Sequence, residues 1–136
     1  MSIEPDAPIA DVQAVEAGLR DFNTALIGSA QQRPVHIFLR QADGEIAGGL
    51  LGEIRWRWLY VAKLWVSESL RGKGYGSQLI TAAESHARTE GCIGIYLDTF
   101  EYQARPFYEK LGFELFGTLE GYPPGYRQFH LAKHLS

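Results

Sequence analysis

Residues Leu64–Gly76 have the sequence LWVSESLRGKGYG, in which an apolar segment is followed by a turn with three glycines and two basic side chains. A helical pattern begins directly after it, so the turn lies between a strand and the start of a helix. Free backbone N–H groups and the positive end of a helix dipole form an anion site at such a place. Glycine lets the main chain approach phosphate oxygens, and Arg71 and Lys73 add positive charge. The segment therefore predicts a site for a phosphorylated ligand.

Two better-known phosphate loops differ from this segment in their spacing. A Rossmann fingerprint would need glycine at the position of Ser77. A Walker A loop needs Ser or Thr directly after its lysine, whereas Lys73 is followed by Gly74. The segment taken alone leaves open that it is a turn whose basic side chains are only solvated.

Upstream of this turn, the pattern predicts one helix and three strands. Apolar residues recur every three or four positions over residues 8–27, which is typical of an amphipathic helix. Strand patterns follow at residues 35–40, 46–56 and 58–66, with an Asp-Gly turn between the first two. Gly48, Gly49 and Gly52 interrupt the second strand, which indicates a bulge or a close approach to the backbone. The middle of the chain is therefore predicted to be an antiparallel meander.

Downstream of the turn, a helix at residues 74–90 leads into a β-branched and aromatic strand at residues 92–98. A strand, a helix and a second strand joined in this way favour a parallel pair with a right-handed crossover. A short helix at 104–111 and two strands at 113–118 and 126–132 complete the pattern. Together, the predicted helices and strands form an α+β domain around one mixed sheet.

Composition narrows the classes of function. The 136 residues are 46% hydrophobic and 21% charged, which suits one globular domain over residues 1–136. A net charge of −3 gives no field that would attract nucleic acid or an anionic membrane, and no apolar stretch approaches the roughly 20 residues that span a bilayer. The lone Cys92 excludes an internal disulfide, and the four histidines lack the spacing of metal ligands. We expect a cytoplasmic protein without a metal site.

Two motifs together resemble those of a known superfamily. The pattern Arg71-x-x-Gly74-x-Gly76 resembles the coenzyme A pyrophosphate loop of the GNAT N-acetyltransferases. Residues 104–113, with the sequence ARPFYEKLGF, resemble the short helix of that superfamily that ends in a Tyr and a Gly-Phe step. Many members carry an asparagine shortly before this helix; here the segment is DTFEYQA at 98–104, and either Gln103 or the backbone is expected to substitute.

The resemblance to a small bacterial-type GNAT member implies the fold and the activity. The fold would be α+β, with a twisted mixed sheet of six to seven strands, helices on its flanks, and a V-shaped splay between the strands ending near Val66 and Asp98. The activity would be acetyl-CoA-dependent transfer to a primary amine of a small molecule, directly within a ternary complex. A protein or peptide acetyltransferase and a non-catalytic acyl-CoA-binding module are the open alternatives. Homodimers are common in the superfamily.

The resemblance also implies the cofactor site. The splay would hold the pantetheine arm, and Tyr108 would protonate the leaving thiolate, since a tyrosine with an ordinary pKa near 10 keeps its proton at neutral pH. Contacts with acetyl-CoA are expected from the strand end, the glycine turn and the short helix, namely Leu64, Trp65, Val66, Arg71, Gly72, Lys73, Gly74, Tyr75, Gly76, Ser77, Gln103 and Phe107.

The acceptor side is predicted from carboxylates and from aromatic residues outside the core periodicity. Glu53 is the first choice for a general base and Asp98 the second, although an amine whose pKa lies near the working pH needs no dedicated base. Aromatic faces near carboxylates suit a cationic amine. The residues expected to contact it are Trp56, Tyr60, Asp98, Phe100 and Tyr122.

Overall fold

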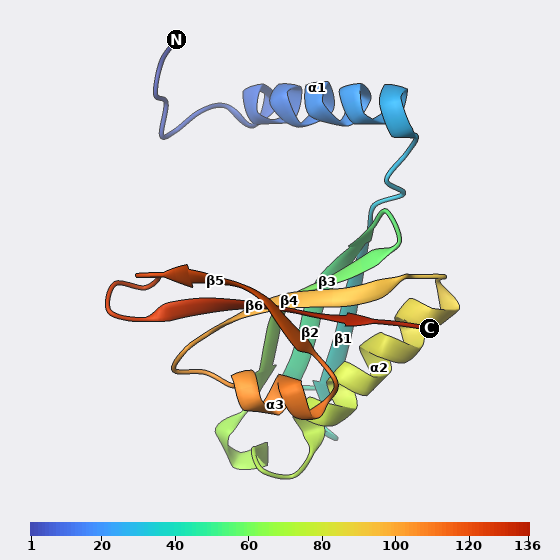
Figure 1. Ribbon diagram of the computed structural model, residues 1–136, viewed down its shortest axis with the longest axis vertical. Helices are drawn as coiled ribbons and strands as arrows, with labels where there is room; N and C mark the ends of the chain where they lie inside the picture. Colours follow the sequence, from blue (N-terminus) through green and yellow to red (C-terminus); the bar gives the residue numbers. More distant parts are fainter. The chain divides into compact units, whose positions relative to one another are not determined.

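The computed structural model describes residues 1–136, which divide into two compact units, residues 1–30 and 31–136 (Figure 1). The first unit contains the predicted amphipathic helix, α1 (Ile9–Ile27). None of its side chains is buried. No helix in the chain has the length and apolar character to cross a membrane.

The second unit is built on one mixed sheet of six strands, within the predicted six to seven. Only β3 and β4 are parallel, and every other neighbouring pair is antiparallel. The strand order is β1-β2-β3-β4-β6-β5. The strands are β1 (Arg33–Arg40), β2 (Ile46–Arg55), β3 (Trp58–Val66), β4 (Gly94–Phe100), β5 (Glu114–Glu120) and β6 (Arg127–His134).

Three helical segments accompany the sheet: η1 (Glu68–Leu70), α2 (Tyr75–Thr89) and α3 (Arg105–Lys110). The apolar residues of α2 and α3 join one core cluster with alternate residues of the strands, such as Leu59, Ile95 and Leu97. Since side chains alternate along a strand, the intervening positions of β3 and β4 lie on the opposite face of the sheet. In Figure 1, α2 and α3 lie together beside the sheet.

The predicted splay is confirmed by the pairing of β3 with β4. These strands pair from Trp58 with Gly94 to Val61 with Leu97, and no further. Beyond that point, β3 continues along β2, and β4 continues along β6 to Phe100. The two strands therefore separate where a ligand can enter, and pairing with β6 extends β4 two residues beyond its predicted end.

A bulge between β2 and β3 explains one of the unusual glycines. The register shifts between Leu51 and Gly52, and a Cβ at Gly52 would lie 2.3 Å from the Tyr60 carbonyl oxygen. Only glycine leaves room for this approach of two backbones.

Candidate active site

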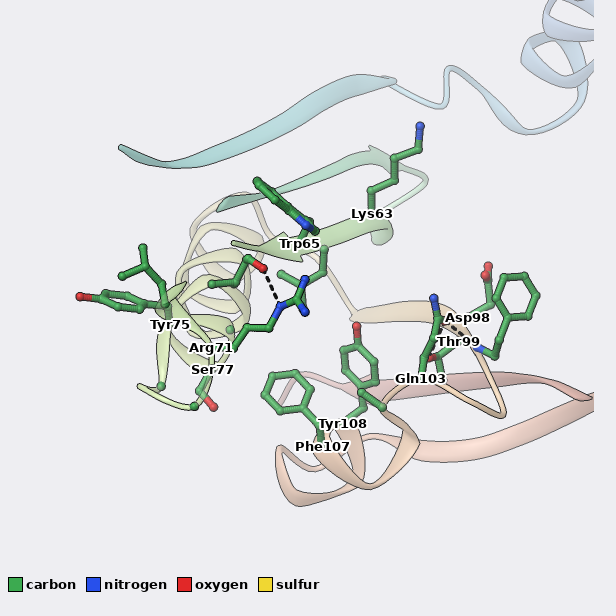
Figure 2. A pocket seen from close by; sticks show the side chains of 18 of the residues that line it. Lys63, Trp65, Arg71, Tyr75, Ser77, Asp98, Thr99, Gln103, Phe107 and Tyr108 are labelled. Atoms are coloured by element: carbon green, nitrogen blue, oxygen red, sulfur yellow. Dashed lines mark hydrogen bonds between the residues drawn. The ribbon is translucent and has the colours of Figure 1, made fainter. Parts of the chain in front are cut away.

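A cleft of about 870 Å³ lies between the separated ends of β3 and β4 and reaches the glycine turn, the start of α2, and α3 (Figure 2). Every residue predicted to contact the cofactor lines it except Lys73. Tyr108, Asp98 and Phe100 line it as well. The cleft thus gathers residues that are up to 46 positions apart, from Ala62 to Tyr108, because the splay places them around one space.

One end of the cleft presents groups that can bind an anion. Gly72 and Gly74 have φ angles of 75° and 85°, and no side chain caps the start of α2. The backbone bond from Gln78 N to Gly74 O is the first of the helix, so the three N–H groups before it are free for a ligand. Arg71 Nε donates to Val66 O over 3.0 Å, which holds the guanidinium beside this turn (Figure 2). These groups fit a pyrophosphate.

The other end offers backbone and amide groups. The edge of β3 that faces β4 has no strand partner beyond Val61, so it can bond an extended chain such as a pantetheine arm. Gln103 Oε1 accepts hydrogen bonds from Thr99 Oγ1 at 3.1 Å and from Phe100 N at 2.8 Å. Its Nε2 makes no bond within the protein and is free to donate. Thr99 was missed by sequence reasoning, although a threonine within an apolar run signals a buried polar bond.

Tyr108 lies on α3 between the rings of Phe107 and Phe113 and is only 8% exposed. Its hydroxyl points into the gap between β3 and β4 (Figure 2), where it makes no hydrogen bond with the protein. Burial raises its pKa, and the negative charge of Asp98 raises it further. Tyr108 therefore keeps its proton at neutral pH and presents it to the cleft.

Tyr60 and Asp98 form a pair at the mouth of the splay. Tyr60 Oη donates to Asp98 Oδ2 over 2.7 Å. Burial, and then this bond to Asp98, raise the pKa of Tyr60 to about 12. Asp98 lines the cleft, whereas Tyr60 is outside the cleft lining. Both residues were predicted to contact the acceptor, but their mutual bond was not.

Three other predicted site residues lie outside the cleft lining. Glu53 is opposite Tyr60 in the sheet, and its Oε2 accepts from Gln32 Nε2 over 2.7 Å. Tyr122 reaches the cleft only through its ring contact with Phe100, at 5.3 Å between centroids. Trp56 lies in the turn between β2 and β3, at the opposite end of β3 from the cleft. The strand runs roughly 13 Å from its first residue, Trp58, to Ala62, the first residue of the cleft lining. The structure does not bring Trp56 to this site.

Comparison with known proteins places these features in a family. A model of the Acetyltransferase (GNAT) family matches residues 7–113. The blasticidin-S acetyltransferase of Streptomyces morookaense is 43% identical over 109 residues, which cover 77% of this chain and 80% of that protein. An acetyltransferase of Agrobacterium fabrum is 39% identical over 115 residues, with coverage of 82% and 83%.

Solved structures agree with the sequence matches. The crystal structure of an acetyltransferase from Bacillus cereus matches this chain with a TM-score of 0.89 and 32% identity. The match covers 99% of this chain and 98% of the Bacillus cereus chain. A protein from Bacillus anthracis, assigned as a streptothricin acetyltransferase and crystallised with acetyl coenzyme A, has a TM-score of 0.65 and 24% identity, with coverage of 73% and 61%. The second likeness is one of fold.

Proposed function

The chain belongs to the Acetyltransferase (GNAT) family, and we propose that it transfers an acetyl group from acetyl-CoA directly to a primary amine of a small molecule, within a ternary complex. Membership makes it an N-acetyltransferase that uses acetyl-CoA. The family match spans both structural units, which supports our proposal that residues 1–136 work as one acetyltransferase domain.

The single observation that carries the mechanism is that Tyr108 lines the same cleft as the glycine turn and the open edge of β3. The free N–H groups at the start of α2, together with Arg71, would hold the pyrophosphate, and the open edge of β3 with Gln103 would hold the pantetheine arm. Bound acetyl-CoA supplies a thioester carbonyl for attack by an amine, and its sulfur leaves. In this proposal, Tyr108 Oη would give that sulfur a proton.

A small-molecule acceptor is supported by the relative with 43% identity that is named for blasticidin-S. The acceptor would reach the cleft from the sheet face that carries Asp98 and Phe100, with Tyr122 behind Phe100. Glu53, our first choice of base from the sequence, lies outside the cleft lining and would need an intervening water to reach an amine there. A peptide or protein acceptor is the alternative.

Arg71→Ala is expected to weaken acetyl-CoA binding about 10-fold, because one charge-assisted contact with a phosphate is lost. Isothermal titration of wild type and variant with acetyl-CoA measures this change. Arg40→Ala removes an equal charge from β1, outside the cleft, and should leave the Kd unchanged. Equal Kd values for Arg71→Ala and wild type would show that the glycine turn is not the phosphate site.

Self-association is supported by the apolar stripe of α1. Val12, Leu19 and Leu26 recur every seven residues, with Val15 and Phe22 between them, and none of these side chains is buried. A helix with such a stripe is stable in water when another surface covers it. We propose that a second copy of the chain supplies this cover in a homodimer.

Leu19→Glu is expected to convert the dimer into a monomer, because it places a charge at the middle of the apolar stripe. Light scattering coupled to size exclusion gives the mass of both proteins. Arg20→Glu, on the next position of α1, is the matched control and should stay dimeric. A monomeric wild type at micromolar concentration would refute the dimer.

A further inference from the structure

Asp98 belongs both to the cleft and to the open face of the sheet. Leu97 and Thr99 are buried in the core, so alternation along β4 places Asp98 on the face opposite α2 and α3. Asp98 nevertheless lines the cleft, because β3 no longer pairs with β4 at this residue, and its negative charge acts on Tyr108 there. Tyr108 approaches the same gap from the core side (Figure 2). The two groups therefore face one space from opposite sides of the sheet.

The Asp98 carboxylate accepts a hydrogen bond from a neutral side chain and forms no ion pair. Tyr60 Oη donates to Oδ2, and no Lys, Arg or His forms an ion pair with Asp98. The neighbouring titratable groups are Glu53 opposite Tyr60, Tyr96 beside it, and His130 opposite Asp98 on β6. Tyr108 and Lys63 line the same cleft as Asp98. A part-buried carboxylate with a free oxygen and no counter-ion is suited to an ammonium group.

We propose that Asp98 binds the protonated primary amine of the acceptor and removes its proton, and that Tyr60 is a positioning residue that fixes the carboxylate. This inference rests on the proposed function and specifies its substrate class as basic aliphatic amines, which are protonated at neutral pH. Weakly basic arylamines would gain nothing from Asp98. Phe100, next in the cleft lining, would contact the body of the acceptor.

The proposed reaction conserves every proton. One ammonium proton goes to Asp98 Oδ1 and then to solvent across the open face of the sheet. The nitrogen lone pair forms the C–N bond while the C–S bond breaks, and Tyr108 Oη protonates the sulfur. Tyr108 recovers its proton from the surplus N–H of the new amide. Each turnover of an ammonium substrate thus releases one proton to solvent.

The test measures kcat and KM of Asp98→Asn, which keeps the shape of the side chain and an oxygen for Tyr60. With a basic aliphatic amine, kcat/KM is expected to fall about 10- to 30-fold at pH 7 and to recover as rising pH supplies free amine. The Kd for acetyl-CoA should not change. In Asp98→Ala, added formate should restore part of the activity, which gives a second reading if the asparagine variant is unstable.

Tyr60→Phe is expected to raise KM for the amine about 3- to 10-fold with a smaller effect on kcat, because one hydrogen bond to the carboxylate is lost. Tyr96→Phe is the matched control: this ring lies 4.9 Å from that of Tyr60, its hydroxyl makes no hydrogen bond, and its kinetics should equal those of wild type.

Two results would overturn the role of Asp98. One is a kcat/KM of Asp98→Asn at pH 7 that equals the wild-type value. The other is a kcat/KM that falls by the same factor at every pH, with no rescue of Asp98→Ala by formate, which indicates a structural role. A wild type that acetylates no small amine would instead overturn the proposed function, so the two failures are distinguishable.

Discussion

Tyr108→Phe is expected to lower kcat about 100-fold, the lower range for loss of a general acid, while the Kd for acetyl-CoA stays within about 2-fold of wild type. The ring packs between Phe107 and Phe113, and phenylalanine preserves that packing, so only the hydroxyl is lost. That hydroxyl makes no bond within the protein, hence its removal leaves no buried group unpaired. Initial rates of thiol release and calorimetric titration give the two quantities.

The pH profile gives an independent reading of the same residue. Tyr108 acts in its protonated form, and burial raises its pKa above the ordinary value of 10.0. The alkaline fall in wild-type kcat that belongs to this group should therefore come above pH 10. Tyr96→Phe again serves as the hydroxyl control. A kcat for Tyr108→Phe within 3-fold of wild type would refute the acid role.

Gly52→Ala is expected to destabilise the protein by about 2–3 kcal/mol, the usual cost of an overpacked site. Its Cβ would meet the Tyr60 carbonyl oxygen at 2.3 Å, and backbone cannot rotate away as a side chain can. For a chain of this size the melting temperature should fall by roughly 10 °C, measured by thermal denaturation followed by circular dichroism. The displaced β3 should also move Tyr60 from Asp98 and raise KM for the amine.

Gly117→Ala provides the matched control on β5. A Cβ there would meet its nearest atom, His130 Cβ, at 3.8 Å, which is ordinary contact. Its melting temperature should stay within about 2 °C of wild type. Equal melting temperatures for Gly52→Ala and Gly117→Ala would show that β2 and β3 do not approach each other closely at Gly52.

Local patterns predicted the parts of the site that lie close together in the sequence. The glycine turn at Gly72 and Gly74 and the helix after it depend on neighbours only, and the structure has both where they were expected. Tyr108 was found through the resemblance of its helix to that of the family. The bulge at Gly52 followed from glycines that a strand interior does not favour.

Features that depend on strand register were not predictable from such patterns. The Tyr60–Asp98 bond joins residues 38 positions apart and exists because the parallel pair aligns Tyr60 with Tyr96. Trp56 was predicted to lie in a strand because its turn contains no Gly or Asn. In the structure its φ is 44°, a backbone conformation that the hairpin turn imposes and that the residue type does not signal. The end of β4 depends on its pairing with β6.

The most direct test of direct transfer to a small-molecule amine is an acceptor panel with acetyl-CoA, in which released thiol is measured and acetylated products are identified by mass spectrometry. The panel should contain basic aliphatic amines, arylamines, aminoacyl and aminoglycoside antibiotics, and peptides with a free N-terminus or lysine. We predict that thiol release matches formation of an N-acetylated small aliphatic amine. Acetylation of peptides alone, or thiol release no faster than without acceptor, would contradict the account.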